Sequence, residues 1–356
     1  MRRSRPRLEP RPPVRGTAFV GAEARREGEA PGEARPSRVA LDVMGGDDAP
    51  DAPLAGAAAA LDEWGGGLRI LAVGEPKAIA EARERIGGPD GEGFGILPAR
   101  QRIEPHEPPA QAVRRKRDSS IVVGLEALRD GRADAFISAG STGAVMVGSH
   151  LILGPLPGVE RPAVGAMFPT ADGPTLVLDV GANVGSRPEH LHQFARLGAI
   201  YVRDLLGAEH PRIGLLNVGE EAGKGDDLAV AAYRLLEEDP SLDFVGNVEG
   251  HQIIQARCDV LVCDGFVGNA LLKFYESMAG FVLDLLRRRF SGVREELEEI
   301  FQFLDYTEYG GAPLLGVNGV SIICHGSSPP RAIKNAIGLA LDSVRSGMVR
   351  DMAAGL

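Results

Sequence analysis

The stretch RVALDVMGG, residues 38–46, is a short apolar run that ends at two glycines. This pattern is typical of a buried strand that leads into a loop. An Ala-rich stretch over 51–63 predicts a helix, and a second apolar run over 68–73 ends at Gly74. Strand, glycine loop, helix and strand at this spacing favour a parallel sheet with helices on both faces.

The same alternation continues to the end of the chain. Further strands are predicted over 94–97, 133–138, 163–168, 175–180, 212–218, 259–263 and 320–324. Further helices are predicted over 76–86, 119–130, 142–153, 188–206, 226–238, 266–303 and 330–347. The pattern therefore predicts an α/β protein with a mainly parallel sheet.

Residues 1–37 differ in composition from the rest of the chain. They are rich in Arg, Pro, Glu and Gly and hold few large apolar side chains. Such a segment buries too little surface to offset the entropy of ordering it, so we expect a disordered extension. The folded domain is then expected over 38–350.

The charge of the chain is unevenly distributed. Its 356 residues carry a net charge of −10, but residues 1–38 hold ten Arg and five Glu, so the remainder is strongly acidic. An acidic body repels a phosphate backbone, and we expect no nucleic-acid partner. Within that body, Arg114, Arg115, Lys116 and Arg117 form one basic cluster. The cluster is either a solvated loop before a helix or a docking place for an acidic partner.

Three cysteines, Cys258, Cys263 and Cys324, form an odd set without zinc-site spacing. No secretory signal precedes them, so we expect buried, reduced thiols in a cytoplasmic protein, with no metal and no cofactor. No apolar run reaches the roughly 18 residues that a membrane span requires.

Polar glycine loops follow strand after strand. They lie at 44–47, 138–143, 179–183, 217–221, 246–250, 264–269 and 325–328. The carboxyl ends of strands line the ligand crevice of open α/β sheets, and the next helix N-terminus presents N–H groups to an anion. Together the loops predict an anion site. None of them is a Walker A, a dinucleotide fingerprint or a serine-nucleophile elbow.

The loops, in order, resemble the PlsX family of bacterial acyl-carrier-protein:phosphate acyltransferases. The resemblance covers residues 38 to about 345 and includes LDVMGGD at 41–47, SAGSTGA at 138–144, LDVGANV at 178–184, DGFVGN at 264–269 and YGGAPLLG at 309–316. Asp48 and Ser141 stand where the family usually has His and Asn, and Gly185-Ser186-Arg187 replaces a usual Asp-x-Lys. We therefore expect no catalytic role at position 48.

The resemblance implies both a fold and a reaction. The fold is a three-layer α/β/α unit, similar to isocitrate and isopropylmalate dehydrogenases, with a smaller sub-domain and a homodimer. The reaction transfers a long-chain fatty acyl group from the thioester of acyl carrier protein to inorganic phosphate. The acyl phosphate then feeds phosphatidic acid synthesis through a downstream acyl-phosphate-using glycerol-3-phosphate acyltransferase. Because phosphate is itself a nucleophile, no acyl-enzyme is required.

The candidate site residues come from the loops and from the scarce lysines. Lys224, Asn183 and His325 are the candidate catalytic residues. The candidate phosphate- and acyl-binding residues are Asp42, Gly45, Gly46, Asp47, Ser141, Thr142, Gly181, Asn217, Asn247, Asp264, Asn269 and Lys273. The candidate docking residues for the carrier protein are Arg114, Arg115, Lys116 and Arg117.

Each candidate also has a purely structural interpretation. Lys224 and Lys273 are alternatively exposed charges, on a loop and on a helix surface. The four asparagines are alternatively turn formers that bond the backbone. His325 is alternatively a structural histidine.

Residues 270–304 form a helical region with apolar side chains at helical spacing. This region is either a dimer interface or a peripheral membrane contact. Two rival functions also stay open: a phosphate acetyltransferase-like enzyme that uses coenzyme A thioesters, and a non-catalytic scaffold that binds carrier protein or membrane.

Overall fold

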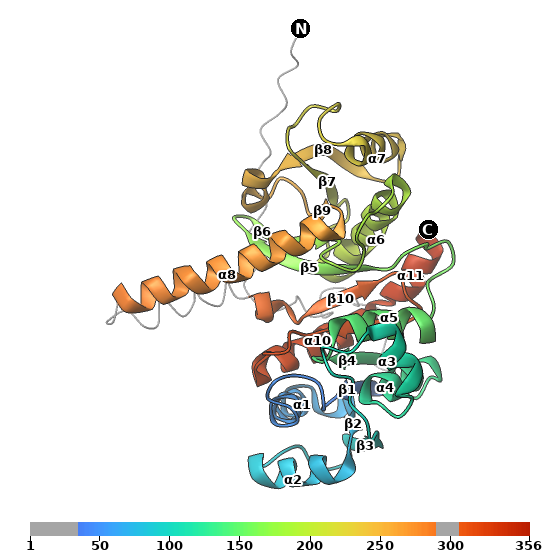
Figure 1. Cartoon of the computed structure of the whole chain (residues 1–356), viewed down its shortest axis with the longest axis vertical. Coiled ribbons are helices and arrows are strands. Elements are labelled where there is room, and N and C mark those ends of the chain that lie inside the picture. Colours follow the sequence, from blue (N-terminus) through green and yellow to red (C-terminus); the bar gives the residue numbers. More distant parts are fainter. Residues whose placement is uncertain (1–34, 290–305) are drawn as a thin grey trace, which may run out of the picture.

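The computed structural model describes residues 35–289 and 306–356, which form one large sheet with helices on both faces (Figure 1). The sheet order is β3-β2-β1-β4-β11-β10-β5-β6-β9-β7-β8. The strands are β1 (Ser37–Asp42), β2 (Leu68–Gly74), β3 (Phe94–Pro98), β4 (Ala135–Ser138), β5 (Ala163–Thr170), β6 (Gly173–Leu178), β7 (Arg212–Asn217), β8 (Asp243–Glu249), β9 (Val260–Val262), β10 (Ala312–Leu315) and β11 (Val320–Ile323).

Most neighbouring strands are parallel, as the sequence predicted. The exceptions lie at the centre of the sheet, where β10 pairs antiparallel with β11 and β5, and β5 pairs antiparallel with β6. These pairs join a half built on β1–β4 to a half built on β6–β9. The α/β class with a mainly parallel sheet is confirmed.

The helices cover both faces of this sheet. They are α1 (Asp51–Trp64), α2 (Pro76–Ile86), α3 (Pro109–Arg115), α4 (Ser120–Arg129), α5 (Thr142–Ile152), α6 (Pro188–Leu206), α7 (Asp227–Glu238), α8 (Gly265–Arg289), α10 (Pro330–Ser346) and α11 (Met348–Gly355).

Alternation along β1 divides the core into two layers. Val39 and Leu41 pack in one layer with α1, α2, α6 and α10, whereas Ala40 packs in the other with α4 and α5. Strands buried on both faces explain why the sequence shows continuous apolar runs rather than alternation.

Four elements were not predicted as such. Strand β8 has a glycine with positive φ in its middle, Gly246, and β10 contains Pro313, so neither resembles a typical strand. Helix α3 begins at Pro109 and includes Arg114 and Arg115, which were predicted in a loop. Helix α11 follows directly after α10.

The basic extension and the long helical region are described only in part. Residues 1–34 lie outside the described residues, whereas Ser37 already belongs to β1 and Arg35 pairs with Asp134 at 2.9 Å. Of the predicted helical region, residues 290–304 also lie outside.

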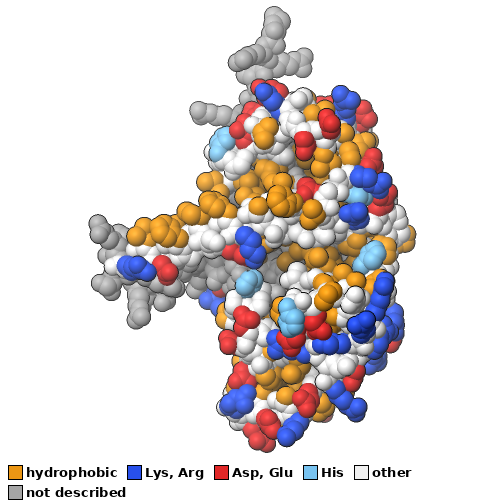
Figure 2. Space-filling model, in the orientation of Figure 1, with side chains coloured by type: hydrophobic (Ala, Val, Ile, Leu, Met, Phe, Trp, Pro, Cys, Tyr) orange, Lys and Arg blue, Asp and Glu red, His pale blue; other side chains and the backbone are white. Residues whose placement is uncertain are grey.

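Helix α8 extends away from the body of the molecule (Figure 1). Its first turns pack against the core through Leu271, Leu272 and Tyr275. Farther along, Figure 2 shows hydrophobic side chains along the helix, and Phe274 and Phe281 are 64% and 62% exposed. Within residues 35–289 and 306–356, no helix has both the length and the apolarity that a membrane span requires.

Candidate active site

Asp42, at the carboxyl end of β1, holds two glycine loops together. Its Oδ2 accepts a hydrogen bond from Ser138 Oγ at 2.7 Å, and its Oδ1 accepts one from the Met44 N–H at 3.0 Å. Burial raises the pKa of Asp42, although these hydrogen bonds oppose the shift. A Cβ on Gly45 would lie 2.5 Å from the nitrogen of Gly140, so only glycine allows this close approach.

The loop at 44–47 also contacts the loop that follows β11. The Asp47 N–H donates to the carbonyl of Gly326 at 2.7 Å. This bond places the 44–47 loop beside His325. Asp42, Gly45, Gly46 and Asp47 therefore form the support of the candidate site on this side.

Asp179 performs the corresponding role after β6. Its Oδ1 accepts hydrogen bonds from the N–H groups of Val164, Gly181 and Ala182 at 3.0–3.2 Å. Its Oδ2 accepts from the backbone and side-chain N–H groups of Asn183 at 2.7 and 2.9 Å. Burial raises the pKa of Asp179 against these five bonds.

Helix α8 begins directly on this loop. A Cβ on Gly268 would lie 1.9 Å from the carbonyl oxygen of Asp179, and one on Gly265 would lie 2.2 Å from that of Asn183. Asp264 accepts hydrogen bonds from the N–H groups of Phe266 at 2.9 Å and Ser186 at 2.8 Å. The segment 264–269 is thus the start of a helix, with Asp264 binding the backbone at its beginning.

Four of the predicted residues come together around one pocket of about 160 Å³. Thr142 lies at the start of α5, Asn269 and Lys273 lie on α8, and His325 follows β11. We call this the reaction pocket. Its apolar wall consists of Val164, Ala166, Met167, Val180, Leu272, Ala312 and Ile323.

Two polar side chains of the pocket have defined partners. Lys273 Nζ pairs with Glu276 at 2.8 Å, so part of its charge is balanced. The Nδ1 of His325 accepts from the Ser327 N–H at 3.2 Å and lies 2.8 Å from Ser327 Oγ. A neutral His325 therefore carries its proton on Nε2. That N–H is available as a donor.

The pocket also contains one thiol. Burial raises the pKa of Cys324 to about 12, so the thiol is protonated at neutral pH. A protonated thiol is a poor nucleophile. Direct attack by phosphate is chemically simpler than an intermediate on this cysteine. Over residues 35–289 and 306–356, no three His, Cys, Asp or Glu side chains gather as metal ligands.

Lys224, Asn217 and Asn247 lie together elsewhere, at the ends of β7 and β8 near one edge of the sheet. Asn217 Nδ2 donates to the carbonyl of Lys224 at 2.9 Å, and Asn247 Nδ2 donates to that of Glu221 at 2.8 Å. Both asparagines hold the loop that carries the exposed Lys224. None of the three lines the reaction pocket.

The remaining candidates have local roles. Ser141 accepts from the Ala144 N–H at 3.4 Å and caps α5. Gly181 has a φ of +133° and faces Asn269.

The basic cluster is partly paired. Lys116 pairs with Glu107 at 2.6 Å, and Arg117 pairs with Glu126 at 2.7 Å. Half of the basic cluster is therefore neutralised by neighbours.

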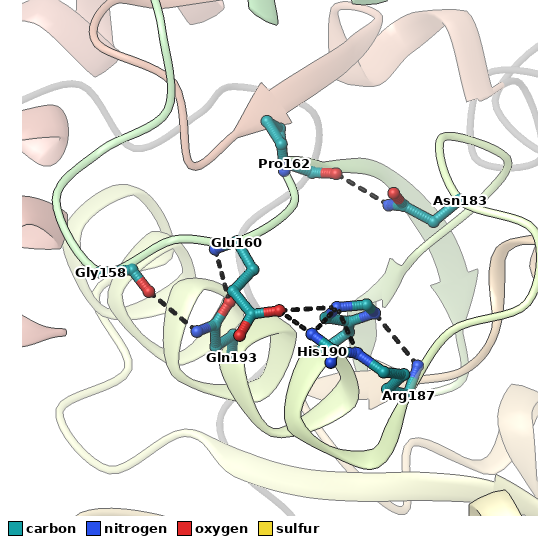
Figure 3. Close-up of polar contacts among 7 residues, drawn as sticks. All are labelled: Gly158, Glu160, Pro162, Asn183, Arg187, His190 and Gln193. Atoms are coloured by element: carbon teal, nitrogen blue, oxygen red, sulfur yellow. Dashed lines mark hydrogen bonds and ion pairs between the residues drawn. The ribbon is translucent and has the colours of Figure 1, made fainter.

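A second polar cluster fixes the segment before β5 (Figure 3). Glu160 accepts a hydrogen bond from Nε2 of the buried His190 at 3.1 Å and pairs with Arg187. These partners, His190 first, lower the pKa of Glu160. Two residues on, the carbonyl of Pro162 accepts from Asn183 Nδ2 at 2.8 Å. The cluster thus positions a neighbour of Asn183.

Three relevant residues were not selected from the sequence. Asp179 ends a strand as Asp42 does, so its position in the chain was a usable signal. Glu276 lies three residues after Lys273, a spacing that pairs charges on a helix. Arg161 lines a neighbouring groove but follows no motif, and nothing in the sequence pattern distinguishes it.

Comparison with known proteins first defines the fold. The chain superimposes on a phosphotransacetylase from Streptococcus pyogenes with a TM-score of 0.59 at 16% identity, covering 88% of this chain and 94% of that one. The fold is that of the phosphotransacylases.

Sequence similarity shows the family to which the chain belongs. A family model described as "Fatty acid synthesis protein" matches residues 37–351. The phosphate acyltransferase of Halothermothrix orenii is 46% identical over 323 residues, which cover 88% of this chain and 96% of that protein. The phosphate acyltransferase of a Nostoc species is 44% identical over 333 residues, 88% and 95% of the two chains. The chain belongs to the PlsX family of phosphate acyltransferases, as its motifs predicted, and it is an acyltransferase that acts on phosphate.

Proposed function

We propose that the protein transfers a long-chain fatty acyl group from the thioester of acyl carrier protein to inorganic phosphate. The observation that carries this proposal is the reaction pocket. The charge of Lys273, partly balanced by Glu276, gathers there with amide and imidazole groups beside an apolar wall. This combination suits a phosphate anion next to an acyl chain. The acyl phosphate product serves phosphatidic acid synthesis through a glycerol-3-phosphate acyltransferase.

Phosphate binds between α5 and α8 in this proposal. The charge of Lys273, the amide of Asn269 and the hydroxyl of Thr142 supply hydrogen bonds or charge. The first turn of α5 adds N–H groups without helical partners. Binding beside the thioester replaces a bimolecular encounter by an oriented attack.

The chemical step needs no covalent intermediate on the enzyme. A phosphate oxygen attacks the thioester carbonyl, the C–S bond breaks, and the proton of hydrogen phosphate ends on the released thiol. His325 keeps its proton on Nε2 and donates a hydrogen bond to the thioester oxygen, where negative charge develops. Asn183 belongs to the loop that completes the pocket, and Asp179 holds it there.

Docking of the carrier protein involves Arg114 and Arg115. Both are exposed at the end of α3, and no ion pair of either is found within the described residues. An acidic carrier is attracted by such a patch even though the chain as a whole is acidic. Lys116 and Arg117 contribute less, because each already has an acidic partner.

The exposed apolar stripe of α8 (Phe274, Met278, Phe281 and Leu285) supports a homodimer. Burying such a stripe against a second copy removes it from water and stabilises association. The alternative is that it contacts a lipid surface, close to where an acyl product is used.

The donor is tested by steady-state kinetics with two thioesters of the same acyl chain. Acyl carrier protein is expected to give a kcat/KM at least tenfold above that of acyl coenzyme A. An equal or higher value with acyl coenzyme A would favour the phosphate acetyltransferase-like alternative. Absence of turnover with both donors would favour the scaffold.

A further inference from the structure

A second groove, of about 290 Å³, adjoins the reaction pocket. It lies between α5, the end of α3 and the loops at 161–162 and 182–183. We call it the outer groove. Its lining consists of Ala110, Arg114, Met146, Val147, His150, Leu151, Arg161, Pro162, Ala182, Asn183 and Leu314.

Three elements are shared by the two cavities. On α5, Thr142 lines the reaction pocket and Met146, one turn later, lines the outer groove. On β10, Ala312 lines the pocket and Leu314 the groove. In the loop after β6, Val180 faces the pocket and Ala182 and Asn183 face the groove. The outer groove therefore lies directly beside the reaction pocket, and a ligand in the groove can extend into the pocket.

The lining of the outer groove combines basic side chains with an apolar floor. Arg114, Arg161 and the imidazole of His150 are its ionisable groups, and no acidic side chain lines it. Met146, Val147, Leu151 and Leu314 supply apolar surface. The fitting ligand is slender, mostly uncharged along its length and anionic at one end.

The residues on both sides of Arg161 are held by polar contacts. Glu160 is tied to His190 and Arg187, and the carbonyl of Pro162 accepts from Asn183 (Figure 3). Both peptide neighbours of Arg161 are thus fixed, which reduces the backbone entropy lost when an anion binds there.

We infer that the outer groove binds the 4′-phosphopantetheine arm of the acyl donor. The inference rests on the proposed function. The phosphate of the arm lies at Arg114, Arg161 and His150, its chain crosses the apolar floor, and its thioester enters the reaction pocket past Asn183. A volume of about 290 Å³ admits such an arm but excludes a folded carrier domain. Arg114, which also attracts the acidic carrier, then binds the phosphate of the arm.

Direct binding of the free arm tests this inference without any turnover. Calorimetry compares 4′-phosphopantetheine with pantetheine, which lacks the phosphate. Wild type is expected to bind 4′-phosphopantetheine at least tenfold more tightly, because charge-assisted hydrogen bonds to phosphate are strong. Arg161→Ala and Arg114→Ala are expected to remove this difference and to leave pantetheine binding unchanged. Arg129→Ala, an exposed arginine at the end of α4, is the matched control and retains the difference.

Equal binding of the two compounds by wild type would overturn the inference, as would an Arg161→Ala variant that still distinguishes them. Kinetics then separate the two sources of the arm. Arg161→Ala is expected to raise the KM of acyl carrier protein and of acyl coenzyme A by at least tenfold each. A rise for the carrier protein alone would place Arg161 on the carrier surface and contradict the inference. Because binding is measured without chemistry, a failure of acyl transfer would overturn the proposed function and not this assignment.

Discussion

The side-chain amide of Asn183 donates to Asp179 Oδ2 at 2.9 Å, and the same Asn183 nitrogen lies 2.8 Å from the carbonyl of Pro162. One amide thus joins the loop after β6 to the segment before β5, at the border of the reaction pocket and the outer groove. The position gives Asn183 a structural role, and in the proposed complex it lies next to the acyl donor.

Asn183→Ala tests both roles. Removal of the amide leaves the partly buried carbonyl of Pro162 and the buried carboxylate of Asp179 each with one donor fewer, so the free energy of unfolding should fall by about 1–3 kcal/mol. We also expect kcat to fall at least tenfold. Urea unfolding and acyl phosphate assays measure the two effects. Lower stability with unchanged turnover would make Asn183 a turn former only.

His325→Ala should lower kcat about 100-fold, the low end for loss of one hydrogen-bond donor to a developing oxyanion. Ser327→Ala should cost less, about tenfold or below, because the backbone N–H of Ser327 still bonds Nδ1 and keeps the proton on Nε2. Steady-state kinetics at saturating phosphate compare the two variants. Normal turnover in His325→Ala would leave the histidine a structural role.

Two lysines compete for the role of phosphate cation, and the reaction pocket favours Lys273 over Lys224. Lys273→Ala is expected to raise the KM for phosphate at least tenfold, since an ionic hydrogen bond to the anion is lost. Lys224→Ala is expected to have the smaller effect. Lys77→Ala, on the surface of α2, is the control. The reverse order of the two effects would restore the role to Lys224.

The apolar stripe of α8 predicts association of two copies. Phe274→Asp with Phe281→Asp places two charges on side chains that are 64% and 62% exposed in one copy. We expect wild type to sediment as a dimer and the double variant as a monomer, because burial of a carboxylate in an apolar interface is costly. If both sediment as monomers and only wild type floats with anionic liposomes, the stripe contacts membranes instead.

Asp342, on α10, is expected to make the free energy of unfolding depend on pH. Burial raises the pKa of its carboxyl to about 6, although Arg345 opposes the shift. Between about pH 4 and pH 6 the unfolded chain releases this proton and the folded chain keeps it, so stability falls as pH rises through that window. Because the side chain is partly exposed, we expect about 1–2 kcal/mol. Asp342→Asn should be the more stable protein at pH 8, and urea unfolding at pH 5 and pH 8 measures the difference. If the free energy of unfolding changed equally between pH 5 and pH 8 in both proteins, Asp342 would be excluded as the source of the pH dependence.

The sequence predicted most strands and helices because the buried strands are continuous apolar runs that end at glycines. It missed β8 and β10, whose Gly246 and Pro313 resemble turn residues. Tertiary pairing overrides local preference in both strands.

The composition of the site was harder to predict. Thr142 and His325 follow the neighbouring strands β4 and β11, whereas Asn269 and Lys273 lie on α8, which begins after β9 and reaches the same pocket. Lys224 and Asn217 have equally suitable motifs but follow β7, near the sheet edge. Strand order decides which loops meet, and hydrophobic pattern does not contain strand order. Arg161 becomes a candidate only through its neighbours in space.

Direct attack of phosphate on the carrier thioester is the central proposal, and a single-turnover experiment tests it most directly. Long-chain acyl carrier protein is mixed with excess enzyme and ¹⁸O-labelled phosphate, and mass spectrometry follows both product and intact enzyme. We predict acyl phosphate that retains all the label, and no acylated protein at any time. An acyl-enzyme that forms before product, or the absence of acyl phosphate, would contradict the account.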